Sequence, residues 1–216
     1  MAISNILPDP NNPINAAGEY DAGGTPGPGY ASVRLSSIEP IMRDRTNSQR
    51  LVTRGVAGHR WEVSINYNPM TREEFDPIYT FLLYRRGGIR PFFVSLPQYT
   101  LPKDSALVTD PTTTSPVVAG ESVIPYTVAA GTPTMGDLFT INDPSDSAHT
   151  KAYMVIGVSA GNIITNTPVA RDISNGSTLT FIDPFIRVVI SGDVQEYNLG
   201  TENLFSFSLK LEEAQI

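Results

Sequence analysis

The stretch Arg60-Trp-Glu-Val-Ser-Ile-Asn-Tyr67 decides the fold class, because apolar and polar residues alternate along it. In an extended chain, successive side chains point to opposite faces. The four large apolar residues therefore share one face: Trp61, Val63, Ile65 and Tyr67. This period of two predicts a β-strand with one face buried in a core.

Similar short patterns recur along most of the chain. A long strand is predicted over residues 202–213, where phenylalanine and leucine alternate with serine, lysine and glutamate. Single strands are predicted at residues 31–36, 91–96 and 186–191. Between the last two lies a region rich in Thr, Ser, Pro and Gly. Turn residues there separate short β-type runs at residues 122–128, 138–142, 152–158 and 177–182. Such spacing is typical of a small barrel or sandwich.

One helix is predicted, over residues 71–86. Thr71 and Glu74 have the spacing of a capping box, which satisfies backbone amides of the first turn. Large apolar residues recur at helical spacing, at Phe75, Ile78, Tyr79, Leu82 and Leu83. Gly87 follows as a stop signal. The apolar stripe predicts that this helix covers one face of the sheet.

Together these elements predict a mainly β protein. We expect a β-sandwich or tube-type sheet with one covering helix (about 71–86) and an inserted small β-barrel or sandwich domain. Residues 31–102 plus 184–216 would form the main β domain, and residues 103–183 the insertion. Residues 1–30 hold five prolines, five glycines and few large apolar side chains. Such a segment buries too little surface to offset its ordering entropy, so we expect an extended N-terminal arm that orders on a neighbour.

Arginine is the sharpest polar feature of the chain, outnumbering lysine twelve to three. Several arginines surround a hairpin that is predicted to join residues 50–55 to residues 59–67 through Val56-Ala57-Gly58. The planar guanidinium favours paired contacts with carboxylates, which subunit interfaces use. We therefore expect seven interface residues: Arg43, Arg45, Arg50, Arg54, Arg60, Arg85 and Arg86. An alternative is that some arginines line a channel beside passing DNA, without specific binding.

Charge is distributed unevenly along the chain. Residues 1–30 carry a net charge of −3, residues 31–102 carry +4, and residues 103–216 carry −8. A basic and an acidic segment on one chain suit head-to-tail packing of identical copies. The alternative is that these charges only solvate exposed faces. A net charge of −7 argues against general nucleic-acid binding.

Residue types that carry chemistry are scarce. The chain has no cysteine and only two histidines, His59 and His149, so we expect no disulfide, no metal centre and no cofactor. Phosphate-loop, dinucleotide-binding and nucleophile-elbow motifs are absent. The carboxylates Glu73, Glu74 and Asp76 could serve a hydrolase, but a helix dipole explains them better. We therefore expect no enzyme. The sequence also has neither a run of 18 apolar residues nor a signal-peptide pattern, so we expect no membrane contact.

The order of several motifs resembles that of tail structural proteins of long-tailed phages. These motifs are the arginine-rich residues 50–55, the stretch Gly58-His-Arg-Trp-Glu-Val-Ser-Ile, the helix start Pro69-Met-Thr-Arg-Glu-Glu-Phe-Asp-Pro-Ile, Arg86-Gly-Gly and residues 92–97. Gly136-Asp-Leu-Phe-Thr-Ile, Ala152-Tyr-Met-Val and Asp183-Pro-Phe resemble the small β domain inserted in such proteins. The closing Phe205-Ser-Phe-Ser-Leu-Lys-Leu-Glu-Glu-Ala is similar to their final strand. The resemblance covers residues 31–216 and is to distal tail, or tube–baseplate adaptor, proteins.

This resemblance implies a ring of identical subunits, commonly sixfold, around the tail channel. The ring would join the tail tube to the baseplate or hub and hold sheath or fibre proteins. It implies assembly in the host cytoplasm, a final location in the virion tail, and no catalysis. The absence of cysteine is consistent with assembly in a reducing cytoplasm.

An alternative function is a carbohydrate-binding or receptor-binding module of the β-sandwich type. In this hypothesis the region 103–183 is the binding head. Exposed aromatic side chains such as Tyr99, Tyr126 and Tyr153 would stack on sugars.

Overall fold

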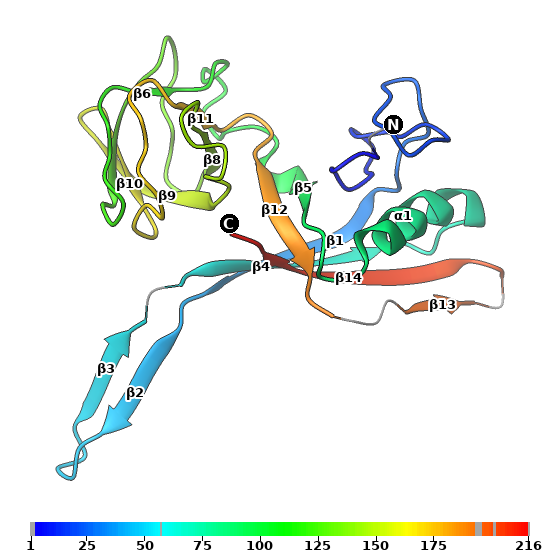
Figure 1. Ribbon diagram of the computed structural model, residues 1–216, viewed down its shortest axis with the longest axis horizontal. Helices are drawn as coiled ribbons and strands as arrows, with labels where there is room; N and C mark the ends of the chain where they lie inside the picture. Colours follow the sequence, from blue (N-terminus) through cyan, green and yellow to red (C-terminus); the bar gives the residue numbers. More distant parts are fainter. Residues whose placement is uncertain (1–2, 57, 193–195, 201, 216) are drawn as a thin grey trace.

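A six-stranded antiparallel sheet forms one part of the protein in a computed structural model (Figure 1). The structure describes residues 3–56, 58–192, 196–200 and 202–215. Along the sheet the order is β1-β4-β14-β12-β5, and β13 pairs with β14 beside this path. The bounds are β1 (Tyr30–Ile38), β4 (Arg60–Tyr67), β14 (Phe205–Glu213), β12 (Phe185–Ile190), β5 (Phe92–Ser95) and β13 (Tyr197–Leu199).

The alternation in β4 buries the predicted face. The exposed fractions of its four large apolar side chains are between 0% and 6%, at Trp61, Val63, Ile65 and Tyr67. Strand β14 lies alongside, with Leu209 directly opposite Ile65. Because opposed side chains share a face, the two central strands together build the floor of the main hydrophobic core.

Helix α1 (Arg72–Arg85) covers this core at one end of the sheet (Figure 1). Its start is capped as predicted, since the Thr71 N–H donates to the Glu74 carboxylate at 2.9 Å. Phe75 stacks on Phe205 of β14 with ring centroids 4.7 Å apart, which fixes the helix on the sheet. The predicted stripe was wrong at Leu83, which is 52% exposed, because the buried face turns toward Phe81 and Arg85 instead.

A closed six-stranded barrel forms the second part, in the order β10-β7-β6-β11-β8-β9. Its core is a separate hydrophobic cluster that includes Ile124, Phe139, Tyr153 and Leu179. Of the predicted alternatives for this region, barrel or sandwich, the structure adopts the barrel. The bounds are β6 (Thr112–Thr113), β7 (Val123–Thr127), β8 (Leu138–Asn142), β9 (Ala152–Ser159), β10 (Asn162–Thr165) and β11 (Thr178–Thr180).

The chain enters and leaves the barrel at neighbouring points. It departs after β5 through the short 3₁₀ helix η1 (Pro97–Tyr99) and returns just before β12. At this crossing the Asp183 N–H donates to the Thr100 carbonyl at 2.9 Å. The outgoing and incoming segments are therefore in direct hydrogen-bond contact.

The N-terminal segment lies on its own chain, in contrast with the predicted extended arm. Leu7 is fully buried, and its N–H donates to the Phe93 carbonyl of β5 at 2.8 Å. The Phe93 N–H in turn donates to the Asn5 carbonyl at 2.7 Å. Residues 3–30 thus cover the outer edge of β5 and the end of α1 (Figure 1). A few apolar anchors and main-chain pairing with an edge strand are enough to order a segment rich in proline and glycine.

A two-stranded hairpin projects from the sheet (Figure 1). It consists of β2 (Ile41–Arg45) and β3 (Leu51–Gly55), and their register runs from Ile41↔Gly55 to Arg45↔Leu51. The predicted hairpin of residues 50–55 with residues 59–67 was therefore wrong. The turn forms earlier, where the Gln49 N–H donates to the Thr46 carbonyl at 2.8 Å and Gln49 takes a φ of 66°. The predicted connection at residues 56–58 includes residue 57, which lies outside the described residues.

Among the residues that the structure describes, no helix has the length and apolar character needed to cross a membrane.

Candidate interaction site: the hairpin and the junction at its base

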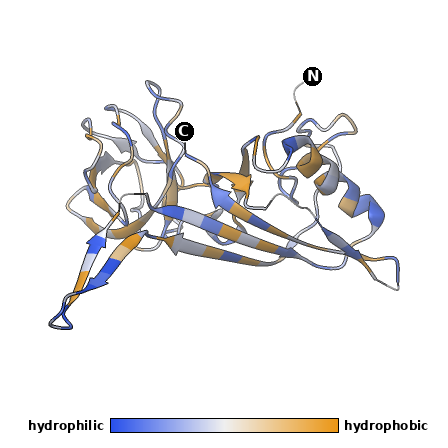
Figure 2. Cartoon of the chain, turned by 60° about the horizontal axis from the view of Figure 1, so that its bottom comes forward, coloured by the Kyte–Doolittle hydropathy of each residue, from blue (hydrophilic) through white to orange (hydrophobic). Residues whose placement is uncertain are grey.

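All ten strand residues of the β2–β3 hairpin are exposed. Four of them are large and apolar, with exposed fractions between 45% and 65%: Ile41, Met42, Leu51 and Val52. Apolar and polar residues mix along both strands (Figure 2). An isolated two-stranded hairpin is marginally stable in water, and a cluster of exposed apolar side chains marks a contact surface. The hairpin therefore has the chemistry of an element that packs against another molecule.

Four of the seven predicted interface arginines lie on this hairpin: Arg43, Arg45, Arg50 and Arg54. All four are exposed, and none forms a side-chain ion pair within the described part of the chain. With Asp44 as the one acid, residues 41–55 carry a net charge of +3. The hairpin thus combines apolar surface with unpaired positive charge.

The other three predicted arginines have contacts within their own chain. Arg60 of β4 pairs with Glu212 of β14 at 2.6 Å, and both side chains are more than one-third exposed. Arg86 is exposed and caps α1 in the left-handed conformation (φ 52°), with its N–H donating to the Leu83 carbonyl. These two arginines keep surface that a neighbour could contact.

Arg85 is different, because only 6% of it is exposed. Its guanidinium lies 4.5 Å from the centre of the Phe81 ring and donates to the carbonyl of Ser4. Burial lowers its pKa from the ordinary value. Arg85 therefore joins α1 to the N-terminal segment, and its burial leaves no surface for the predicted subunit contact.

At the base of the hairpin, the sheet and the barrel meet at a buried polar cluster that we call the Glu213 junction: His59, Trp61, Lys151, Ala152 and Glu213. The Lys151 ammonium donates to the Glu213 carboxylate at 3.0 Å and to the His59 carbonyl at 2.9 Å. Glu213 also accepts the backbone N–H groups of Trp61 (3.2 Å) and Ala152 (2.9 Å). The Trp61 indole donates to the Ala152 carbonyl at 2.9 Å. Together these hydrogen bonds join the start of β4 and the end of β14 to the start of β9.

The Glu213 junction excludes solvent. The Lys151 side chain is 5% exposed and the Glu213 side chain 0%. Burial lowers the pKa of Lys151, and the Glu213 carboxylate opposes that shift. Burial, with a smaller contribution from the Lys151 ammonium, lowers the pKa of His59 to about 4. His59 is therefore neutral at neutral pH, and its Nε2 lies 2.9 Å from the Ser37 hydroxyl oxygen.

The sequence analysis did not identify this junction, although one signal was present. Residues 205, 207, 209 and 211 define the inward face of β14, and Glu213 continues that face. A carboxylate at a core-facing position requires buried partners. His59, at the start of the predicted strand of residues 59–67, is only 8% exposed.

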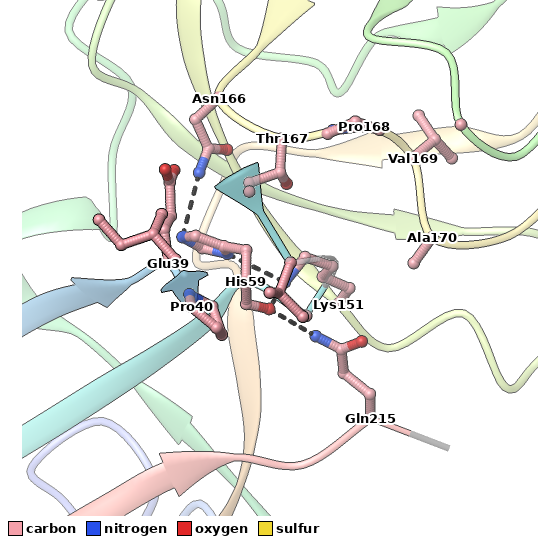
Figure 3. A pocket seen from close by; sticks show the side chains of 15 residues that line it. Glu39, Pro40, His59, Lys151, Asn166, Thr167, Pro168, Val169, Ala170 and Gln215 are labelled. Carbon is pink, nitrogen blue, oxygen red and sulfur yellow. Dashed lines mark hydrogen bonds between the residues drawn. The ribbon is translucent and has the colours of Figure 1, made fainter. Parts of the chain in front are cut away.

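Beside the junction lies a cavity of about 500 Å³, which we call the junction cavity (Figure 3). Its walls come from the hairpin base, from the barrel loop of residues 166–170 and from Gln215. Most of the lining is apolar, including Pro40, Val56 and Val169. The hydroxyl of Thr167 is buried there and has no hydrogen-bond partner within the described residues. Apolar walls with a few convergent polar groups are typical of binding sites at the boundary between two folded units.

The carboxylates weighed for hydrolysis serve the helix start. Glu74 accepts the Thr71 N–H, and Asp76 pairs with Arg72 at 3.3 Å one turn away. Within the described ranges, no group of three His, Cys, Asp or Glu side chains is placed to hold a metal ion. Asp143 and Asp146 accept backbone N–H groups in tight turns.

The aromatic side chains suggested for sugar binding are not available as platforms. Tyr126 is 9% exposed and Tyr153 is 0% exposed, because both point into the barrel core. Tyr99 is half-buried against the main core. The stacking part of the carbohydrate hypothesis was therefore wrong for two of its three residues.

These features define the chain as a mainly β protein whose most distinctive surface is a projecting, basic and partly apolar hairpin. The chain is 29% identical over 227 aligned positions to the distal tail protein pb9 of Escherichia phage T5, and the alignment spans 96% of this chain and 98% of that relative. The predicted resemblance to distal tail proteins of phages is confirmed. No family model matches the chain.

Proposed function

We propose that this chain is a structural component of a phage tail. In this proposal it forms a ring of identical copies, with sixfold symmetry, and adapts the tail tube to the baseplate or hub. It acts by assembly and not by catalysis. Its partners are further copies of itself and other tail proteins, namely tube, hub, sheath or fibre proteins. DNA passes through the ring without specific binding. The ring assembles in the host cytoplasm and ends in the virion tail.

The observation that carries this proposal is the similarity to a distal tail protein along nearly the whole of both chains. End-to-end similarity favours a shared overall role more than a shared fragment would. The proposed division of labour follows the predicted domains. The body of the ring consists of residues 31–102 plus 184–216, and a module outside it consists of residues 103–183. The N-terminal segment, residues 1–30, is available to contact a neighbouring subunit during assembly.

Two surfaces support lateral contacts between copies. The first is the hairpin, with its exposed apolar residues and net charge of +3. The second is the outer edge of β1, because β1 pairs with β4 on one side and with no strand on the other in the described part of the chain. An unpaired edge of nine residues is a template for pairing with another sheet. Native proteins usually protect an unpaired strand edge, and in the proposed ring a neighbouring copy covers the outer edge of β1.

Light scattering after size-exclusion chromatography, combined with electron microscopy of the purified full chain, tests the proposal. We expect ring particles of one defined mass. An Arg43→Glu variant should weaken the assembly, whereas Arg72→Glu, which makes the same charge change on an exposed helix position, should not. A chain that stays monomeric at all concentrations and is absent from purified virions would refute the proposal.

A further inference from the structure

We propose that the junction cavity receives the hairpin tip of a second copy of this chain. This inference rests on the proposed ring, and it specifies which surfaces meet. Each copy would donate one tip and offer one cavity. Such a head-to-tail contact repeats from copy to copy and closes when the rotation permits a ring.

The hairpin tip presents an apolar group next to a cation. Leu51 is 54% exposed and lies directly opposite Arg45 in the hairpin register. Residues directly opposite each other in an antiparallel pair point to the same face. One face of the tip therefore offers an isobutyl side chain to fill a cavity and a guanidinium to contact an acid at its rim.

The junction cavity has the complementary arrangement. Its walls include Pro40, Val56 and Pro168, and the exposed Glu39 carboxylate stands at its rim (Figure 3). The exposed acids Glu121 and Asp172 lie nearby. Glu121 follows the lining residue Gly120, and Asp172 accepts the N–H of Ala119, which precedes it.

Four bases line this rim or adjoin a lining residue in the described part of the chain. Arg60, Lys151 and Arg171 pair with the acids Glu212, Glu213 and Asp146. Arg54 has no ion pair within the described residues and stands against the three exposed acids. The rim is therefore acidic, opposite in sign to the hairpin. Charge complementarity of this kind steers association and fixes the orientation of the partner.

The chain's own hairpin tip does not reach the junction cavity. Ile41 and Gly55 at the hairpin base line it, and the tip lies four residues further along each strand. At 3.2–3.4 Å per residue, this separation is about 13 Å along the strand. A disulfide needs Cα atoms less than about 7 Å apart. A covalent link between the tip and the junction cavity therefore reports a contact between two copies.

Cysteine cross-linking tests the inference cleanly because the chain has no native cysteine. We expect the full-length Leu51→Cys/Ala170→Cys variant to form disulfide-linked multimers under mild oxidation. Both positions are exposed, so the changes leave the core intact. The matched control is Leu51→Cys/Val108→Cys, which places the second thiol on a barrel residue that is 70% exposed and does not line the cavity. The control should give at least tenfold less cross-linked product.

A charge exchange adds a second measurement. Glu39→Arg should slow cross-linking of the Leu51→Cys/Ala170→Cys variant about two- to fivefold, in line with an exposed ion pair. Adding Arg45→Glu should restore the rate. Rings that form normally but cross-link no faster than the control would overturn the inference and leave the proposed function standing. A chain that forms no ring at all would overturn both.

Discussion

Removing the carboxylate of Glu213 should destabilise the protein far more than any nearby surface change. Glu213 accepts hydrogen bonds from groups on both parts of the chain: the Lys151 ammonium, the N–H groups of Trp61 and Ala152 and, at 3.5 Å, the side-chain amide of Gln215. The Glu213→Ala variant leaves a buried ammonium without its counter-ion and two buried amides without their acceptor. The losses at Lys151 and Ala152 act on the contact between the sheet and the barrel, and the loss at Trp61 acts between β4 and β14 within the sheet.

The magnitude follows from burial. Breaking a fully buried ion pair by removing one partner costs about 3–5 kcal/mol. For a chain of this size, 1 kcal/mol corresponds to about 2–4 °C in melting temperature, so we expect a fall of about 6–20 °C. A Lys151→Met/Glu213→Leu variant should recover part of this loss, because it removes the unpaired charge. It still leaves the two amides unsatisfied, at about 1–3 kcal/mol each.

Glu212→Ala is the matched control, because Glu212 is the preceding residue on the same strand. Its ion pair with Arg60 is more than one-third exposed, and such pairs contribute about 0–1 kcal/mol. Chemical denaturation measures both variants, and hydrogen exchange at the amides of Trp61 and Ala152 reports the junction directly. If Glu213→Ala loses less than about 1 kcal/mol, or no more than Glu212→Ala, the reasoning about the junction is wrong.

Three further predictions follow from contacts in the rest of the chain. Arg85→Ala should lower the free energy of unfolding by about 2–4 kcal/mol and speed proteolysis of the N-terminal segment, because Arg85 packs on Phe81 and binds the Ser4 carbonyl; unchanged proteolysis would contradict this. Thr71→Ala should cost about 0.5–2 kcal/mol in urea denaturation as a lost helix cap, and an unchanged midpoint would refute the cap. Stability should fall as the pH drops from about 6.5 toward 4, because burial lowers the pKa of His59 in the folded state to about 4 and the unfolded chain then binds more protons. For His59→Gln, denaturation at several pH values should show that the free energy of unfolding changes less steeply with pH than in the unmodified chain. His149, whose pKa burial also lowers, accounts for part of the pH dependence that remains. An identical pH dependence in the variant would count against His59.

Residue alternation and helix capping predicted the parts of the fold that depend on local sequence. In β4 and β14 the period of two identified the buried face, and Thr71 with Glu74 identified the start of α1. Local pattern failed where several pairings were compatible with it. Residues 51–55 suit a strand equally well beside β2 or β4, and only the turn at Thr46 to Gln49 selects β2.

The candidate site was harder to predict because its parts are distant in sequence. Lys151 and Glu213 are 62 residues apart, and each appears alone as an ordinary surface charge. The four hairpin arginines were identified as interface candidates from residue type, and all four are exposed on a projecting element. The same reasoning failed for Arg85, because residue type does not reveal that a helix end is covered by the N-terminal segment.

The hydrogen bond between Asp183 and Thr100 has a consequence for the evolutionary history of such chains. The segment that leaves the sheet after β5 and the segment that returns to it before β12 are joined by this hydrogen bond, with the donor nitrogen 2.9 Å from the acceptor oxygen. A short turn could therefore replace everything between them without disturbing the pairing of β5 with β12. Modules of different origin are therefore exchangeable at this position in related sequences. The exchange has one condition: Glu213 takes two of its four donors from β9 and the residue before it. Relatives that lack the barrel, or carry another module there, should have an apolar residue at the position of Glu213.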